Sequence, residues 1–212
     1  MYHDRQWTLE KARRRLALIT PAVYHQRAEL DPLAYQILPD ASVTPDPAAT
    51  LTGEIETLAY NSYWGGDDIT FLMQTRFTIP SEWADDAPVA LYLPLGDAHS
   101  FSHPEALVYV DGDSIAACDR HHQEILLSPR YRDGAEHLLT LHGWTGSGPQ
   151  ERRILFMQPC QIVQIDPATR QFVARARVAL ETVDTLDENS YERARLLNAL
   201  EAAFKQLDTR EP

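Results

Sequence analysis

A run of alternating apolar and polar residues, DITFLMQTRFTIP at residues 68–80, restricts the fold of this chain more than any other segment. Its apolar side consists of Ile69, Phe71, Met73, Phe77 and Ile79, and its polar side consists of Thr70, Gln74, Arg76 and Thr78, with Leu72 as an apolar exception. Side chains of a strand alternate between the two faces of a sheet. The pattern therefore predicts a long antiparallel strand that is buried on one face.

The same two-residue period returns along VALYLPL at residues 89–95. Short apolar runs follow at residues 107–110, 125–127, 137–141, 154–157 and 162–165. Turn-forming residues separate these runs, among them DGD at 111–113, DG at 133–134 and GSGP at 146–149. Many short strands with regular turns predict an antiparallel sandwich or barrel rather than repeated strand–helix–strand units.

Helical periodicity is confined to the two ends of the chain. Near the N-terminus, apolar spacings of three and four predict a helix over residues 8–20, with Thr8 as N-cap and Pro21 just after its end. Toward the C-terminus, Thr185 and Glu188 have the spacing of a capping box. The apolar stripe that follows consists of Leu197, Leu200, Phe204 and Leu207. Such a stripe must be buried, either on the sandwich or on a part of the protein outside this chain.

Composition indicates the boundaries between the helical segments and the β-strands. Residues 39–50, PDASVTPDPAAT, are rich in Pro, Asp, Ala and Thr and predict a linker or irregular loop. We expect an N-terminal helical segment with this linker at 1–50, a β-sandwich at 51–176 and a C-terminal helical segment at 177–212. Residues 171–183 are compatible with a last strand or with the start of a helix. The expected fold is mainly β, with helices flanking an antiparallel sandwich.

The chain has 212 residues and a formal net charge of −12. This acidic balance repels phosphate backbones and anionic lipids, so we expect neither nucleic acid nor a membrane as partner. The start of the chain lacks the apolar core of a secretory signal, and no stretch approaches the ~20 apolar residues of a membrane span. The expected location is cytoplasmic. Cys118 and Cys160 are too few for a disulfide framework, and the sequence leaves open whether they pair.

Motifs of common active sites are absent: the sequence has no Gly-rich phosphate loop, G-x-S-x-G, H-E-x-x-H or C-x-x-C. Two pairs of histidines remain, His99 with His103 and His121 with His122. Zinc sites need three or four converging ligands, so a polar turn is the preferred interpretation of ACDRHHQEI.

Carboxylates and tryptophans are the candidate sugar contacts of this sequence. Adjacent carboxylates such as Asp67 and Asp68 diverge in a turn, which makes them poor candidates for a glycosidase pair. Trp64, Trp83 and Trp144 could stack on sugar rings, although the core is the commoner place for tryptophan.

Three segments carry a resemblance when they are taken in order: YWGGDDITFLMQTRFTIPSEW at 63–83, EALVYVDGDSIAACDRHHQEILL at 105–127 and VALETVDTLDENSYERARLLNALEAAF at 178–204. They contain an I-P-x-x-W strand end at 79–83, a V-Y-V-D-G strand and turn at 108–112, and D-x-x-H-x-E-I at 119–125. In this order they resemble the N-terminal region of glycoside hydrolase family 38 α-mannosidases, in the branch of cytosolic and vacuolar enzymes. The resemblance covers nearly the whole chain.

This resemblance implies a jelly-roll, galactose-binding-like β-sandwich that precedes a catalytic domain. The family's catalytic domain opens with a His-x-His-x-Asp motif for zinc, which does not occur here. The chain is thus expected to be a non-catalytic α-mannosidase domain with no catalytic or metal residue and no cofactor. Zinc or another divalent metal is expected in the catalytic domain of the parent enzyme. Candidate partners are that catalytic domain, a second copy of the chain, and mannosides or oligosaccharides.

Five residues are expected to face sugar because of their place in turns and loops: Trp64, Asp67, Asp111, Asp119 and His122. Two other functions remain open. One is a free-standing carbohydrate-binding sandwich module. The other is a small metal enzyme that uses the four histidines of the two pairs with nearby aspartates.

Overall fold

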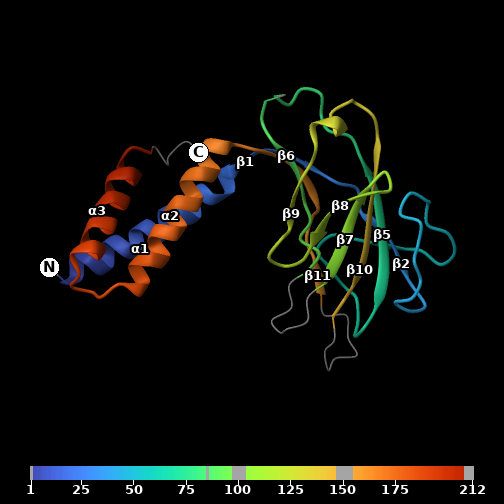
Figure 1. Cartoon of the computed structure of the whole chain (residues 1–212), viewed down its shortest axis with the longest axis horizontal. Coiled ribbons are helices and arrows are strands. Elements are labelled where there is room, and N and C mark those ends of the chain that lie inside the picture. Colours follow the sequence, from blue (N-terminus) through green and yellow to red (C-terminus); the bar gives the residue numbers. More distant parts are fainter. Residues whose placement is uncertain (1, 85, 97–103, 147–154, 208–212) are drawn as a thin grey trace. The chain divides into compact units, whose positions relative to one another are not determined.

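The computed structural model describes residues 2–84, 86–96, 104–146 and 155–207 (Figure 1). The chain forms two compact units. One consists of Met1–His25 with Ile165–Pro212, and the other of Gln26–Gln164. The first unit is helical and the second contains the β-sheets.

Antiparallel strands make up the β unit. They are β1 (Tyr24–Glu29), β2 (Leu33–Ile37), β3 (Glu56–Leu58), β4 (Ser62–Trp64), β5 (Thr70–Phe77), β6 (Val89–Tyr92), β7 (Glu105–Val110), β8 (Asp113–Cys118), β9 (Glu124–Leu126), β10 (His137–Trp144), β11 (Leu155–Met157) and β12 (Gln161–Ile165). The larger sheet has the order β3-β2-β5-β10-β7-β8 and the second has the order β1-β12-β6-β9. Strands β11 and β4 form a separate pair. The expected mainly antiparallel β-sandwich with helices from both ends of the chain is confirmed.

The core lies between the two larger sheets. Phe71 and Met73 of β5 and Leu139 and Leu141 of β10 are fully buried there, together with Leu91 from the second sheet. Gly143 of β10 continues the inward side, because a Cβ at this position would lie 2.6 Å from Cζ of Phe71. The alternation along residues 69–79 therefore places its apolar side in the core, as predicted.

The outer face of the larger sheet is covered over part of its area. Leu72 points outward from β5 and is buried against Leu38 and Leu51. Gln74 is buried beside it, where its Nε2 donates to the carbonyl of Ala49 at 2.8 Å and to Oγ1 of Thr140 at 2.9 Å. Of the two alternatives expected for residues 39–50, the structure shows the irregular loop, which folds over the outer face of the sheet and is not a spacer between domains.

A two-residue turn joins β7 to β8. Asp111 and Gly112 have φ values of 52° and 87°, the left-handed conformation that two-residue hairpin turns require. Asp111 also receives the backbone N–H of Leu138 on its Oδ1 at 2.8 Å. The V-Y-V-D-G motif is thus a strand followed by a hairpin turn.

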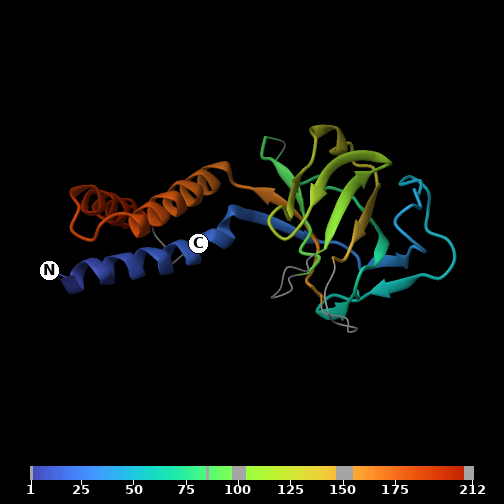
Figure 2. The ribbon, with the colours of Figure 1, turned by 60° about the horizontal axis from the view of Figure 1, so that its bottom comes forward.

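The helical unit contains α1 (Tyr2–Ile19), the 3-10 helix η1 (Thr20–Val23), α2 (Pro167–Thr185) and α3 (Tyr191–Lys205), which Figure 2 shows from a second direction. Thr8 lies inside α1, so its predicted role as N-cap is wrong. The predicted capping box is wrong too. Helix α2 ends at Thr185, and the N-cap of α3 is Ser190, whose Oγ accepts the N–H of Arg193.

The apolar stripe of α3 is covered within this unit. Leu197, Leu200 and Phe204 are buried, and α3 contacts both α1 and α2. Phe204 meets the ring of Phe172 edge-on at a centroid distance of 5.4 Å. Leu207 is 38% exposed and does not belong to the buried set. The stripe therefore needs neither the sandwich nor a further domain to be buried.

The observed division differs from the expected one at both boundaries. Strands β1 and β2 precede residue 51, where the sandwich was expected to begin. Residues 171–183 belong to α2, which starts ten residues before the expected helical segment at 177. Strand β1 lies beside β12 and β2 pairs with β3 and β5, so strands from before residue 51 belong to both larger sheets, which composition along the chain does not report.

Replacing Phe204 by Ala should lower the free energy of unfolding of the helical unit by about 3–5 kcal/mol, because a buried aromatic ring is lost. Chemical denaturation followed by far-UV circular dichroism measures this change. Val178→Ala on the exposed side of α2 is the control, with an expected change within about 0.5 kcal/mol. Equal effects of the two substitutions would contradict the packing of α3.

Candidate functional site

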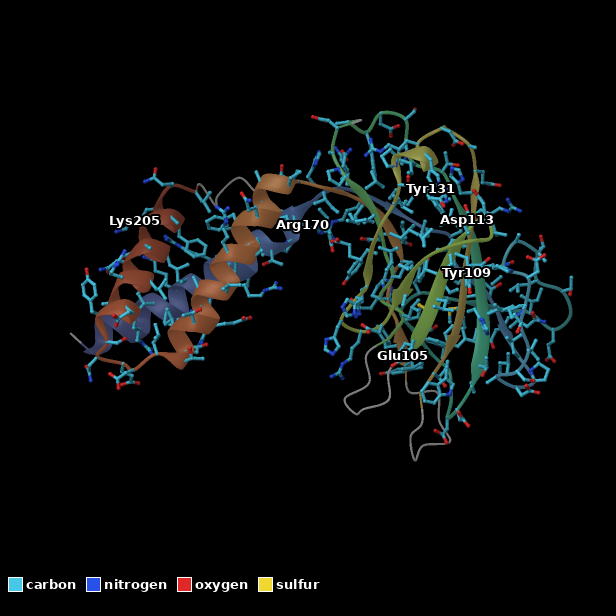
Figure 3. The ribbon with its side chains drawn as sticks, in the orientation of Figure 1. Glu105, Tyr109, Asp113, Tyr131, Arg170 and Lys205 are labelled. Atoms are coloured by element: carbon cyan, nitrogen blue, oxygen red, sulfur yellow. The ribbon has the colours of Figure 1, made fainter. Side chains whose placement is uncertain are left out.

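An open groove lies on the part of the outer sheet face that residues 39–50 leave uncovered. Its volume is about 630 Å³, within the ~300–1,000 Å³ common for small-molecule sites. The residues that line it are Ala41, Asp68, Thr70, Glu105, Ala106, Leu107, Ala117, Cys118, Asp119, His142, Gly143 and Trp144. Glu105, labelled in Figure 3, marks the end of β7 at which the groove is found.

Strand register explains why several of these residues share one face. Trp144 of β10 pairs with Thr70 of β5 on one side and with Glu105 of β7 on the other. Two residues earlier, His142 pairs with Leu107, which in turn pairs with Ala117 of β8. Residues paired across antiparallel strands point to the same face, so two cross-strand rows form the floor of the groove.

The indole of Trp144 is held in place by a hydrogen bond. Its Nε1–H donates to Oδ1 of Asp68 at 2.7 Å. Asp68 has a φ of 54°, in the left-handed region, and its backbone N–H donates to the carbonyl of Gly146 at 3.0 Å. Trp144 is nevertheless 37% exposed, so part of the ring faces solvent.

Thr145 fixes the turn that carries Asp68. Its buried Oγ1 accepts the N–H of Ile69 at 3.0 Å and donates to the carbonyl of Gly66 at 2.8 Å. Because the turn is hydrogen-bonded to the end of β10, Asp68 and Trp144 are positioned by one connected element. A rigid support of this kind lowers the entropy cost of ordering a binding side chain.

The groove is acidic. Asp68, Glu105 and Asp119 contribute carboxylates, and none of the described residues that line it is Lys or Arg. Burial disfavours the charged form of His142 and lowers the pKa of its imidazole, so this ring does not offset the negative charge at neutral pH. The site is therefore suited to ligands that donate hydrogen bonds and carry no negative charge.

Trp64 lies in the core, which corrects its predicted place in a sugar site. It is fully buried, its Nε1–H donates to the carbonyl of Leu95 at 2.7 Å, and its ring packs edge-on against Tyr35 and Phe71. Trp83 is buried as well. Of the three tryptophans weighed in the sequence, Trp144 is the exposed one.

Asp111 has a structural role. It follows the end of β7 opposite to Glu105. Its Oδ2 lies 2.7 Å from Nδ1 of His137, and Nε2 of His137 lies 3.1 Å from both the carbonyl of Tyr131 and Oδ1 of Asp133. Figure 3 shows Tyr131 and Asp113 at this end, away from Glu105. Asp111 therefore ties the β7–β8 turn to the start of β10 and does not line the groove.

Burial lowers the pKa of His137, but the two carboxylates outweigh it, so the pKa lies above its ordinary value of 6.5. The pKa of Asp111 lies below its ordinary value despite its partial burial, because Leu138 and His137 donate to it. The cluster is a clamp in which the imidazole bridges two turns, and protonation of His137 makes its contacts with Asp111 and Asp133 ion pairs.

Asp119 lines the groove, and His122 lies beside it. Oδ1 of Asp119 accepts the backbone N–H groups of His121 and His122 at 2.6 and 2.7 Å and lies 3.0 Å from Nδ1 of His122. Burial raises the pKa of the Asp119 carboxyl, but these donors outweigh burial and lower the pKa to about 2. A second depression of about 520 Å³, bordered by β8 and β9, contains both Asp119 and His122. The hydrogen bonds agree with the preferred interpretation of this segment as a polar turn.

Asp67 is the last of the five residues that were expected to face sugar. Asp67 is exposed in the turn beside Asp68. Within the described ranges no group of three or more His, Cys, Asp or Glu side chains could hold a metal ion. His99 and His103 lie outside the described residues. Cys118 and Cys160 are free, buried thiols, which answers the question of pairing that the sequence left open.

The sequence contained a usable signal for the groove. His142 and Trp144 continue the two-residue period of 137–141, but on the outward side of the strand. A tryptophan at such an outward position indicates a binding surface more strongly than a tryptophan within an apolar run does. Glu105 and Leu107 follow the same rule along β7, and neither was singled out.

Comparison with known proteins gives a likeness of fold. No family model matches the chain, and no curated protein matches its sequence. A solved structure of β-glucuronidase from Faecalibacterium prausnitzii is similar, with a TM-score of 0.50 and 14% identity. The likeness covers 67% of this chain and 32% of that chain, so the present chain spans less than half of the other protein. The β-sandwich thus has a distant structural likeness to part of a glycoside hydrolase.

None of the described helices combines the length and the apolar character needed to cross a membrane. This finding concerns the helices alone.

The clamp at His137 predicts a pH dependence with a definite sign. A raised folded-state pKa means that the stabilisation is complete below pH 6.5 and is lost as pH rises through the folded pKa. The unfolding free energy of the wild type minus that of His137→Asn should therefore fall between about pH 6 and pH 8. His142→Asn is the matched control with the opposite sign, because its lowered pKa gives a contribution that is present above pH 6.5 and lost on acidification. Equal pH slopes for the wild type and His137→Asn would contradict the clamp.

Proposed function

We propose that the chain is a non-catalytic β-sandwich domain of an enzyme that hydrolyses terminal α-D-mannosides. The observation that carries the proposal is the V-Y-V-D-G strand and hairpin turn at 108–112, set within a sandwich that has a structural likeness to a glycoside hydrolase. The likeness supports a carbohydrate-related domain. The finer assignment to α-mannosidases rests on the order of the three sequence segments that resemble family 38.

The domain's role in this proposal is to support and shape the catalytic domain. That domain would provide the Asp nucleophile, and zinc or another divalent metal would hold the sugar hydroxyls there. The polar clusters at His137 and Asp119 bind turns of the sandwich, which fits a supporting role. A cytoplasmic location belongs to the same proposal.

Self-association gains no support from α3. An apolar face of this helix without a partner would favour contact with a second copy of the chain. Leu197, Leu200 and Phe204 are buried within the helical unit, so that argument no longer applies.

The second candidate function is a free-standing carbohydrate-binding module. The exposed Trp144 and the acidic groove favour it, because modules of this kind need a binding surface of their own. The natural coding sequence discriminates the two. An open frame that continues from Pro212 into a His-x-His-x-Asp segment supports the enzyme domain, whereas a stop codon supports the module.

The direct test is an assay of the natural protein that contains this segment, beside the 212-residue chain alone. The proposal expects release of 4-nitrophenol from 4-nitrophenyl α-D-mannopyranoside by the natural protein and none by the chain alone. 4-Nitrophenyl β-D-glucuronide is the matched substrate control. Turnover of the mannoside by the isolated chain, or no glycosidase activity in the natural protein, would contradict the proposal.

A further inference from the structure

We propose that the groove on the outer face of the larger sheet binds neutral pyranosides, with Trp144 as the stacking surface, and discriminates against uronic acids. This inference deepens the carbohydrate-related function proposed above and rests on it. Of the five residues expected to face sugar, Asp119 lines this groove and the other four do not.

Trp144 presents an apolar surface. Its one polar atom, Nε1, already donates to Asp68, and the rest of the half-buried indole is carbon. The apolar C–H face of a pyranose ring needs such a surface, and an aromatic ring provides it at a low cost in conformational entropy. Leu107, which is 46% exposed, extends the apolar floor in the neighbouring row.

Hydroxyl groups would find acceptors around this surface. Asp68, Glu105 and Asp119 line the groove, and a carboxylate can accept several hydrogen bonds. The indole N–H of Trp144 donates to Oδ1 of Asp68, whereas Oδ2 of Asp68 takes no part in that hydrogen bond. A neutral sugar supplies hydroxyl donors and C–H faces, which match an aromatic surface with acceptors around it.

The charge of the groove defines the ligands that it rejects. Three carboxylates face the site, and the lowered pKa of His142 leaves the imidazole neutral at pH 7. A uronate would place a fourth negative charge within a few ångströms of these groups. At such distances, inside the ~8–10 Å Debye length of physiological salt, repulsion is only partly screened. Neutral hexosides should bind, and glucuronic acid should bind much more weakly.

The experiment is a titration of the complete 212-residue chain, observed by ¹H–¹⁵N NMR. The probes are methyl α-D-mannopyranoside, methyl glucopyranoside and methyl galactopyranoside, with sodium glucuronate as the charged competitor. We expect saturable shifts of the Trp144 indole N–H with at least one neutral probe, at a dissociation constant in the ~1 mM range or tighter. The chain has four tryptophans, so the signal is assigned by its loss in Trp144→Phe.

Variants separate the stacking surface from general effects. Trp144→Ala should weaken binding at least about 10-fold, as measured from backbone amide shifts, whereas Trp144→Phe should retain part of the affinity because it keeps an aromatic face. Tyr63→Ala is the matched control, since Tyr63 is an exposed aromatic residue on β4 and does not line the groove. It should bind as the wild type does.

A separate variant tests the discrimination between neutral sugars and glucuronate. Glu105→Gln removes one negative charge with little change of shape. The difference in affinity between neutral sugars and glucuronate should therefore be smaller in this variant. Raising the salt concentration should act in the same direction.

Three results would overturn the proposal: no saturable shift with any neutral probe, equal or tighter binding of glucuronate, or unchanged binding in Trp144→Ala. None of them bears on mannoside turnover by the natural protein, so this inference can fail while the proposed enzyme domain stands.

Discussion

Strand β10 is hydrogen-bonded along both edges, to β5 and to β7, and the rest of the sandwich depends on this central position. Its inward side places Leu139 and Leu141 in the core. At Gly143 the inward side has no Cβ, because the ring of Phe71 and the backbone of β7 occupy that space. Its outward side carries His142 and Trp144 into the groove. One strand thus connects the close packing of the core with the surface at which a ligand would bind.

Most of the polar residues that could suggest an active site hold the backbone together instead. Asp111 and Asp133 hold His137 between two turns, and Asp119 receives the N–H groups of the turn that follows β8. Each of these carboxylates has a lowered pKa because donors and positive charge surround it. A perturbed pKa in this sandwich therefore reports turn structure at these positions and is not by itself a sign of chemistry.

The groove exists because one segment covers the outer sheet face only in part. Residues 38–51 bury Leu72, Gln74 and Thr140, and Ala41 of the same segment borders the space that is left open. The uncovered part carries an exposed tryptophan with acidic residues around it. The β-sandwich shares its fold distantly with part of a glycoside hydrolase. The two proposals concern different parts of it: one gives the sandwich a supporting role in an enzyme, and the other gives the outer sheet face a contact with sugar.

The sequence by itself determined the local elements. The two-residue period of 69–79 predicted β5, Asp111-Gly112 predicted a turn, and the stripe of α3 predicted an amphipathic helix, because these signals depend on neighbours within a few residues. Only the tertiary structure decided which surfaces are covered. Alternation shows that a strand has two faces, but it does not show that residues 38–51 cover one of them or that α1 and α2 bury the stripe of α3. For the same reason the sequence could not rank Trp64 against Trp144: burial depends on contacts between segments far apart in the chain, and these form only when the sheets pack.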